Sequence, residues 1–405
     1  MKTTEEVLSL IKTFEPVGSE HVQLSEAFER VLSRDISSPE DLPGFLRSTV
    51  DGYAIRAKDS FGATESLPAF LEIAGEVKMG EPPSIPAGSG KAVRIPTGGM
   101  LPEGADSVVM IEYCHLLDQS TLEISRAVSP QENVIQPDDD FKRGAPVLRA
   151  GRRLRPQDVG VLAGLGVREV PVFRIPKVAV ISTGDEVVPV GEKPKPGQVR
   201  DMNTYTLAAF CKQERVTPVP LGLCGDRFDE LSNLVRKGLD ESDTVWISGG
   251  SSVGERDLTL KVFESMEDMA LLVHGISISP GKPTIVARAG RRALFGLPGH
   301  VASAMVVAEI FLRPFLATLS GVAAFETKER DVVKARLARN LESVSGRDDF
   351  IRVRLVKEGG NWIAEPIFGK SGLISTLVEA DGLLHVDRNT EGLYRGEMVK
   401  VRMLR

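Results

Sequence analysis

The spacing of hydrophobic and polar positions changes three times along the chain, and each change predicts a different kind of structure. At the amino terminus, the apolar residues from Val7 to Phe14 recur at helical spacing. Thr3 and Glu6 precede them with the spacing of a capping box, which satisfies free amides at the start of a helix. A second short helix is expected to begin near Ser25.

The second pattern runs from residue 67 to residue 128, where short apolar runs are separated by prolines and glycines. This texture predicts a small β-rich domain. A helix is then expected from Pro156, which suits a first helical turn, to Leu165, with Gly166 as its C-cap. Because helical segments flank the β-rich block, we interpret the block as an insertion into a helical domain.

From Pro176 the pattern becomes that of an α/β protein. Short apolar runs suited to buried parallel strands alternate with helices that are expected to begin near Asn203, Arg227 and Ala302. Asn203 is expected to cap the first of these helices. The runs are Val178–Ile181, Val216–Leu221, Thr244–Ile247 and Ala293–Gly296. Such alternation predicts a doubly wound, mostly parallel sheet that binds ligands at the carboxyl ends of its strands.

After Gly321, apolar residues alternate with lysine and arginine, as in half-buried antiparallel strands. The segments are 333–337, 351–355 and 399–402. They fit a small β-barrel or sandwich, and we expect the barrel. The predicted fold class is therefore a multidomain α/β protein: a doubly wound sheet domain, a helical and β-rich amino-terminal region, and a C-terminal β-barrel.

Composition narrows the class of protein. A chain of 405 residues is too long to fold around one ordinary hydrophobic core. The 50 basic and 56 acidic residues give a net charge of −6, and basic runs interleaved with aromatic residues are absent, so no nucleic-acid partner is expected. Three scattered cysteines suggest neither a zinc site nor a disulfide framework. The sequence shows neither a signal peptide nor a membrane span, and a cytoplasmic protein is expected.

Glycines and polar residues follow the predicted strands, at the edge where such sheets bind ligands. Glycine lets backbone amides approach an anion closely. The carboxylates that accompany them need a bridging Mg²⁺ beside a phosphate, because like charges repel. The segments are Ser182–Glu186, Gly225–Asp226, Ser248–Asp257 and Gly296–Gly299, with a cation, Lys282, on the turn Ser279–Pro283. The pattern predicts a site for a phosphorylated ligand, although each single carboxylate is also a common helix cap or turn former.

Taken in order, these motifs resemble those of the molybdopterin molybdenumtransferases, the molybdenum-insertion enzymes of molybdenum cofactor biosynthesis, which are related to the E domain of gephyrin. Ordered matches over most of a chain are more specific than a single glycine pattern. The matching segments are Ser48–Ala54, Pro96–Gly99, Pro102–Asp106, Ser182–Glu186, Ser248–Asp257, Pro280–Pro283, Gly296–Gly299 and Ser371–Ala380.

The resemblance implies a reaction and an assembly. Adenylylated molybdopterin is hydrolysed with Mg²⁺, molybdate is placed on its dithiolene, and AMP is released. The expected subunit has four parts: 1–50 with 135–175, 51–134, 176–322, and 323–405. The resemblance also implies a homodimer, whose sites combine the α/β and C-terminal domains of one chain with the β-rich domain of the other. Transient contacts are expected with the molybdopterin adenylyltransferase and with enzymes that accept the cofactor.

Residue roles follow from the same resemblance. Catalytic roles are implied for Glu186, Asp140 and Lys282, with Glu186 and Asp140 at the metal. The implied substrate-binding residues are Asp51, Thr97, Thr183, Asp226, Ser248, Gly249, Gly250, Asp257, Pro298 and Ser371, of which Asp51 and Thr97 come from the partner subunit. Alternatives are a general base for Glu186, a solvated turn for Asp140, and turn-bracing roles for Asp51 and Thr97.

The sequence departs from the family pattern at three places. Ile135 stands near where an arginine is common, Ser279 where a lysine is sometimes found, and His300-Val301 where Asn-Pro is usual. We interpret His300 as a helix cap in place of asparagine. Two alternatives to the molybdate enzyme remain open: a paralogue that prefers tungstate, and a molybdopterin-binding scaffold with little turnover.

Overall fold

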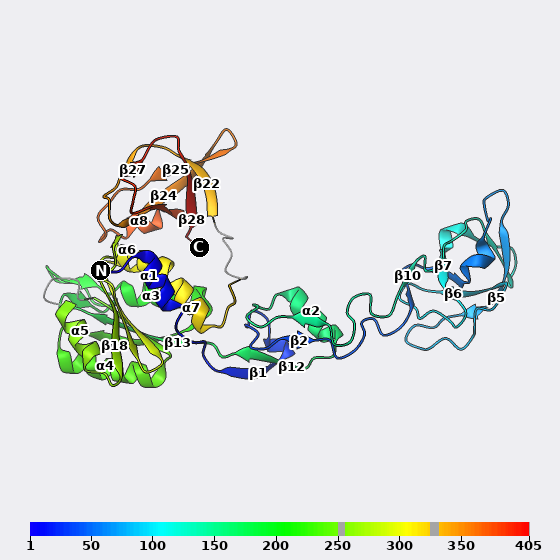
Figure 1. The fold of residues 1–405 in the computed structure, drawn as a ribbon, viewed down its shortest axis with the longest axis horizontal. Coiled ribbons are helices and arrows are strands. Elements are labelled where there is room, and N and C mark those ends of the chain that lie inside the picture. Colours follow the sequence, from blue (N-terminus) through cyan, green and yellow to red (C-terminus); the bar gives the residue numbers. More distant parts are fainter. Residues whose placement is uncertain (250–255, 325–331, 405) are drawn as a thin grey trace. The chain divides into compact units, whose positions relative to one another are not determined.

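The computed structural model describes residues 1–249, 256–324 and 332–404, and the side chains of Arg256 and Asp257 are outside the description. The chain forms two compact units (Figure 1). Unit 1 comprises residues 1–34, 150–155 and 169–405, and unit 2 comprises residues 35–149 and 156–168. The boundaries of the four predicted domains stay a prediction.

A six-stranded, mostly parallel sheet forms the centre of unit 1 (Figure 1). Strands β16, β13, β17 and β21 are parallel neighbours in that order, and β20 and β18 complete one edge as antiparallel strands. The bounds are β13 Lys177–Thr183, β16 Thr217–Cys224, β17 Thr244–Ser248, β18 Met269–His274, β20 Ile285–Ala289 and β21 Arg292–Leu297. The four predicted strands are confirmed, whereas β18 and β20 were not predicted.

The central strands are buried on both faces, which explains their continuous apolar runs. In β13, Val178 and Val180 pack on one face, in the same core as α1, α3 and α7, while Ala179 and Ile181 pack on the other with α4 and α5. The doubly wound sheet is therefore confirmed. The helices are α1 Thr4–Ile11, α3 Asn203–Gln213, α4 Phe228–Glu241, α5 Arg256–Glu264, α6 Val301–Val307 and α7 Arg313–Leu319, with a π-helical turn at Ala308–Leu312.

Two helix predictions need correction. The segment near Ser25 is only a 3-10 turn, Leu24–Glu26, because Val31 and Leu32 form β-bridges to Arg153 and Val172 instead of continuing a helix. Asn203 does not cap α3: the amide of Thr204 donates to Asp201 Oδ1 (3.1 Å). The capping box of Thr3 and Glu6 at α1 is present as predicted.

The segment Val301–Leu319 is long and apolar enough to cross a membrane, but 72% of it is buried inside the protein. Its residues contribute to the same core as Trp246 and Phe295 of the central sheet. We therefore interpret it as a core segment of unit 1. The three cysteines, Cys114, Cys211 and Cys224, are free thiols.

The C-terminal part of unit 1 is a closed five-stranded barrel, as predicted. Its strands follow the order β24, β25, β22, β28 and β26, and pairing of β24 with β26 closes the ring. Strand β19, Ile278–Ser279, adds to β24 in parallel and joins the barrel to the α/β part. The bounds are β22 Val332–Leu337, β24 Asp348–Glu358, β25 Asn361–Pro366, β26 Gly382–Val386 and β28 Met398–Met403.

Unit 2 contains the predicted β-rich block. Its six-stranded sheet has the order β7, β4, β6, β5, β9 and β8. The bounds are β4 Gly52–Ile55, β5 Ala69–Glu76, β6 Lys91–Ile95, β7 Ser107–Met110, β8 Cys114–Leu116 and β9 Thr121–Ile124. The helix predicted from Pro156 is α2, Pro156–Gly164, and Gly166 follows it with a φ of +70°.

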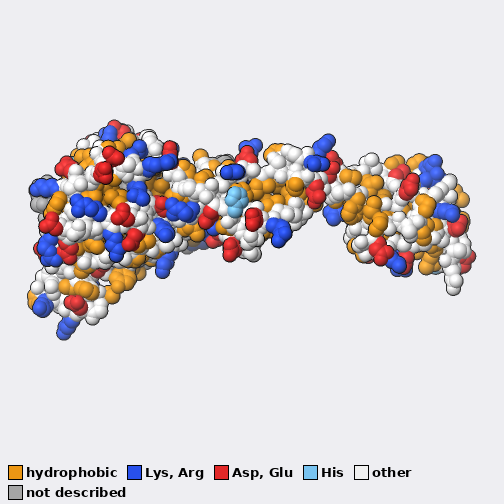
Figure 2. Space-filling model, turned by 90° about the horizontal axis from the view of Figure 1, so that it is seen from below, with side chains coloured by type: hydrophobic (Ala, Val, Ile, Leu, Met, Phe, Trp, Pro, Cys, Tyr) orange, Lys and Arg blue, Asp and Glu red, His pale blue; other side chains and the backbone are white. Residues whose placement is uncertain are grey.

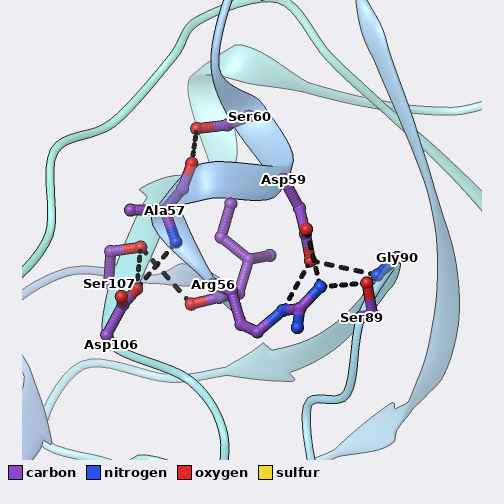
Figure 3. Close-up of polar contacts among 9 residues, drawn as sticks. Arg56, Ala57, Asp59, Ser60, Ser89, Gly90, Asp106 and Ser107 are labelled. Atoms are coloured by element: carbon purple, nitrogen blue, oxygen red, sulfur yellow. Dashed lines mark hydrogen bonds and ion pairs between the residues drawn. The ribbon is translucent and has the colours of Figure 1, made fainter.

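Figure 3 shows what one matched motif of unit 2 does structurally. Asp106, which ends the segment Pro102–Asp106, accepts a hydrogen bond from the amide of Ala57 (2.7 Å). Nearby, Arg56 donates two hydrogen bonds to Asp59 (2.8 and 2.9 Å). These contacts fix the 3-10 turn Ala57–Ser60 after β4, so Asp106 has a structural role in this unit.

Candidate functional site: a cationic cleft beside the strand ends

Three parallel strands of the central sheet end side by side, and their ends bring predicted site residues together. Ser182, Ser248 and Leu297 are aligned in register on β13, β17 and β21. The residues that follow them, Thr183, Gly249 and Pro298, therefore lie along one edge of the sheet. Because neighbouring strands are about 4.8 Å apart, this row spans roughly 10 Å.

Thr183 and Asp226 contact each other at this edge. The Thr183 hydroxyl donates to Asp226 Oδ1 (2.9 Å), and the Asp226 amide donates to Asp185 Oδ1 (3.1 Å). Glu186 is exposed in the turn that follows β13. Acidic groups on adjoining turns thus form a carboxylate shelf, defined here as Asp185, Glu186 and Asp226.

The turn after β17 requires glycine at its first position. Gly249 has a φ of +133°, and a Cβ there would lie 1.9 Å from the carbonyl oxygen of Thr183. Ser248 is buried, and its hydroxyl has no hydrogen-bond partner among the described residues. Gly250 and the side chain of Asp257, which the sequence also predicts at the site, lie outside the described residues.

A cleft of about 540 Å³ lies between the α/β part and the barrel of unit 1. Three predicted residues line it: Lys282, Pro298 and Ser371. Glu186, Thr183 and Asp226 are not among its described lining residues, so the predicted side chains occupy two places, the cleft and the carboxylate shelf. The two are linked through Pro298, which lines the cleft and ends the row of strand ends. The remaining lining comes from Ile276–Pro283, His300, Ser303, Gly346, Arg347, Phe350–Arg352, Gly369 and Met1.

The charged side chains that line the cleft are cationic: Lys282, Arg347 and Arg352, with no aspartate or glutamate among the described lining residues. Arg352 is 8% exposed and donates to two neutral oxygens, Thr376 Oγ1 (3.1 Å) and the carbonyl of Gly369 (3.0 Å). Burial lowers the pKa of Arg352. In the described part of the chain this buried cation has no carboxylate partner, whereas Arg347 pairs with Asp349 (3.0 Å).

Sequence reasoning missed Arg352. The alternation of residues 351–355 predicts that Arg352 and Arg354 both point to solvent, but only Arg354 is exposed. The prediction for Arg352 is wrong because the barrel meets the α/β part at the start of β24, which buries both faces of that strand. The available signal was the run Asp348-Asp349-Phe350, which breaks the polar and apolar alternation just before Arg352.

His300 also has a different role from the one predicted. It occupies the N-cap position of α6, but its side chain makes no capping hydrogen bond. Instead, Nδ1 lies 2.8 Å from the hydroxyl oxygen of Ser371. The preceding peptide is held by Asn203, whose side-chain amide donates to the carbonyl of Gly299 (2.7 Å). The fold therefore positions the imidazole at the cleft.

Three further predicted residues lie in unit 2. Asp51 Oδ1 accepts hydrogen bonds from the amide (2.7 Å) and the hydroxyl (3.0 Å) of Thr97, and these bonds hold the pKa of the Asp51 carboxyl below its ordinary value. Asp140 is exposed, and its amide donates to the carbonyl of Leu42 (3.0 Å). At the first departure from the family pattern, Ile135 pairs across two short strands with Arg47.

The described residues of a single chain contain no cluster of three histidine, cysteine, aspartate or glutamate side chains suited to hold a metal ion. Mg²⁺ does not need such a cluster, because it retains several waters and binds through one or two carboxylates together with substrate phosphates. An exposed carboxylate such as Glu186 fits that mode of binding.

Over the face shown in Figure 2, acidic and basic side chains are interspersed.

Comparison with known families and proteins shows to which family the chain belongs. Residues 2–166 match the MoeA N-terminal region (domains I and II), residues 179–318 a probable molybdopterin-binding domain, and residues 334–404 the MoeA C-terminal region (domain IV). The molybdopterin molybdenumtransferase of Haemophilus influenzae is 34% identical over 95% of this chain and 94% of its own length. The chain belongs to the molybdopterin molybdenumtransferase family.

Other relatives agree with this assignment. The molybdopterin molybdenumtransferase of Bacillus subtilis is 30% identical over 99% of this chain and 94% of its own length. A crystal structure of the molybdopterin biosynthesis MoeA protein from Pyrococcus horikoshii OT3 superposes with a TM-score of 0.85, at 32% identity and with both chains fully covered. The resemblance read from the motifs is confirmed, and the molybdopterin molybdenumtransferase family consists of transferases of molybdenum cofactor biosynthesis.

Proposed function

We propose that this protein inserts molybdate into adenylylated molybdopterin with the help of Mg²⁺ and releases AMP, in the cytoplasm. Family membership supports a molybdopterin substrate. The observation that carries the proposal is the buried guanidinium of Arg352, which has no carboxylate partner among the described residues and lies in a cleft lined by cations and hydroxyls. Such a site favours an anion, which gains charge-assisted hydrogen bonds and offsets the cost of burying the cation.

The cleft offers a complete set of donors for a small oxyanion or a phosphate. Lys282 is exposed on its turn and supplies a mobile ammonium group. The hydroxyls of Ser303 and Ser371 add neutral donors, and Pro298 forms part of the wall. A cation close to the phosphates stabilises the charge that develops when a phosphoanhydride breaks, and this is the role we assign to Lys282.

In this proposal Glu186, of the carboxylate shelf, and Asp140 would hold the metal. Mg²⁺ bound there supplies charge neutralisation between the carboxylates and the substrate phosphates. Thr183, Asp226, Ser248, Gly249, Gly250 and Asp257 would bind the nucleotide-linked substrate. Asp226 is then oriented toward it by the Thr183 hydroxyl.

The proposal includes a homodimer, in which Asp51 and Thr97 of the second copy complete the site. The two hydrogen bonds that Thr97 donates to Asp51 support a joint role, because they hold both side chains in one place. The proposal also includes transient contacts with the adenylyltransferase, which would supply the substrate, and with cofactor-accepting enzymes, which would take up the product.

The direct test is to incubate the purified protein with adenylylated molybdopterin, Mg²⁺ and molybdate, and to follow AMP release. A parallel reaction with tungstate tests for a preference between the oxyanions. We expect Glu186→Ala to lower turnover by about 100-fold or more, as when a group acting in the transition state is removed. Glu192→Ala removes another exposed glutamate, which lies beyond the short strand Val187–Val188, and should keep normal turnover.

Two outcomes would contradict the proposal. Equal turnover in wild type and Glu186→Ala would remove Glu186 from the reaction. Wild-type protein that binds the substrate but releases no AMP with either oxyanion would favour the molybdopterin-binding scaffold.

A further inference from the structure

His300 and Ser371 form a pair whose hydrogen bond changes direction when the imidazole is protonated. Their atoms, Nδ1 and Oγ, lie 2.8 Å apart, and both residues line the cleft. Neutral imidazole with its proton on Nε2 accepts at Nδ1, so the serine hydroxyl donates to it. Imidazolium donates at Nδ1, so the hydroxyl accepts and its own proton is free to point elsewhere.

This reversal matters for an anion in the cleft. When Ser371 donates to His300, its remaining lone pairs face outward and repel an anion. When Ser371 accepts from His300, its proton is available for the anion, and a further positive charge stands beside it. Both effects strengthen anion binding in the protonated state, and imidazole changes charge between about pH 5 and 8 in proteins.

Among the described residues that line the cleft, none offers His300 an acidic partner. The charged side chains that line the cleft with it are Lys282, Arg347 and Arg352, and the amino group of Met1 is a further titratable cation there. Arg347 is paired with Asp349. Carboxylates are missing from the described lining residues, so a bound anion is the group that gains from protonation of the imidazole. Gly372 flanks the ring, because a Cβ on it would lie 3.8 Å from His300 Cδ2.

We propose that His300 is a positioning residue that links anion binding in the cleft to proton uptake, by setting the direction of the Ser371 hydroxyl. The inference rests on the proposed function, because it assumes that the cleft takes an oxyanion or phosphate group of the substrates. It assigns a purpose to a departure from the family pattern that sequence reasoning interpreted as a helix cap.

The test is equilibrium binding of sulfate, molybdate and tungstate to the full-length protein, by calorimetry, at about pH 6 and about pH 8, on either side of the imidazole range. Sulfate keeps the same charge at both values and serves as the reference anion. Because a charge-assisted hydrogen bond is roughly twice as strong as a neutral one, we expect about tenfold tighter binding at the lower pH.

Three variants isolate the pair. The side chains introduced by His300→Asn and His300→Gln cannot titrate. Each variant should therefore reduce the pH dependence of anion affinity to about twofold or less, which is the part that other titratable groups contribute. Ser371→Ala should also remove most of the pH effect. His115→Asn, on strand β8 of unit 2, should keep the full wild-type dependence.

The outcomes separate this inference from the proposed function. Anion binding that changes equally with pH in wild type and His300→Asn, or that does not change with pH in wild type, overturns the role of His300 and leaves the cleft assignment standing. Wild-type protein that binds none of the three anions at either pH overturns both the cleft assignment and the role of His300. A purely structural role for His300 would alter affinity at both pH values alike, which also contradicts the inference.

Discussion

Thr4, in the first helix, donates a hydrogen bond of 2.6 Å to Asp348, at the start of β24, and so connects segments 344 residues apart. Asp348 is fully buried. Its other oxygen lies 2.8 Å from His385 Nε2 and accepts from the amide of Arg388 (3.3 Å). A buried carboxylate needs such partners, because each unpaired lone pair costs desolvation energy. The carboxylate therefore joins the amino-terminal helix to the barrel.

We expect Thr4→Val to lower the free energy of unfolding by about 1–3 kcal/mol, because it leaves a buried carboxylate oxygen without its donor. Scanning calorimetry measures the effect. Thr206→Val is the matched control: Thr206 is only half-buried, and its hydroxyl donates a solvent-exposed hydrogen bond to the carbonyl of Met202, at the start of its own helix. That control should change stability by less than about 0.5 kcal/mol. Equal stability of Thr4→Val and wild type would show that the contact is energetically neutral.

A second prediction concerns Gly249. Alanine there would place a Cβ against the carbonyl of Thr183, in a backbone conformation that favours glycine. We expect Gly249→Ala to destabilise the protein by about 1–3 kcal/mol or to distort the turn and weaken substrate binding. Gly191→Ala, where a Cβ meets nothing within 4 Å, should be close to neutral. A Gly249→Ala protein with wild-type stability and wild-type substrate affinity would contradict the geometry.

A third prediction follows from the lowered pKa of Asp51. The backbone bond from Thr97 is the larger cause and the hydroxyl bond the smaller, so Thr97→Val should raise the pKa of Asp51 partway toward its ordinary value. Carbon-detected NMR titration measures this directly. Because the folded-state pKa is depressed, the contribution of Asp51 to stability is present above its unfolded-state pKa and is lost as the pH falls through the folded-state value. No movement of the Asp51 titration in Thr97→Val would show that the hydroxyl does not contact it.

Local patterns of hydrophobic and polar residues predicted much of the fold. The strands Val178–Ile181 and Thr244–Ile247 were predictable because they are buried on both faces and carry continuous apolar runs. Strands β18 and β20 were not predicted, because β18 lies at the sheet edge and is partly exposed, and β20 follows directly on a proline turn. The segment after Ser25 looked helical by spacing, but long-range bridges to Arg153 and Val172 determine its structure.

The candidate site was predictable to the extent that it follows strand ends. Thr183, Gly249 and Pro298 fall in one row because their strands are parallel and in register. Arg352 and the pairing of His300 with Ser371 depend on contacts between the α/β part and the barrel, which are far apart in sequence. Periodicity within one strand or helix carries no information about such contacts.

We infer that Arg352 is a buried cation whose role is to bind an anion. Replacing Arg352 should therefore weaken anion binding while the free energy of unfolding changes little. Arg352→Met deletes an uncompensated buried charge, so we expect stability to change by less than about 1 kcal/mol despite the loss of two hydrogen bonds. Its affinity for molybdate should fall by about tenfold or more, because the anion loses a charge-assisted hydrogen bond.

The most direct measurement is molybdate binding to Arg352→Met and to Arg354→Met, by calorimetry, with the melting temperature of each variant recorded. Arg354 lies two residues further along β24, is exposed and pairs with Glu379 (3.0 Å), so its replacement removes the same charge outside the cleft. The account predicts weakened binding for Arg352→Met alone. A folded Arg352→Met protein that binds molybdate as tightly as wild type and Arg354→Met would contradict it.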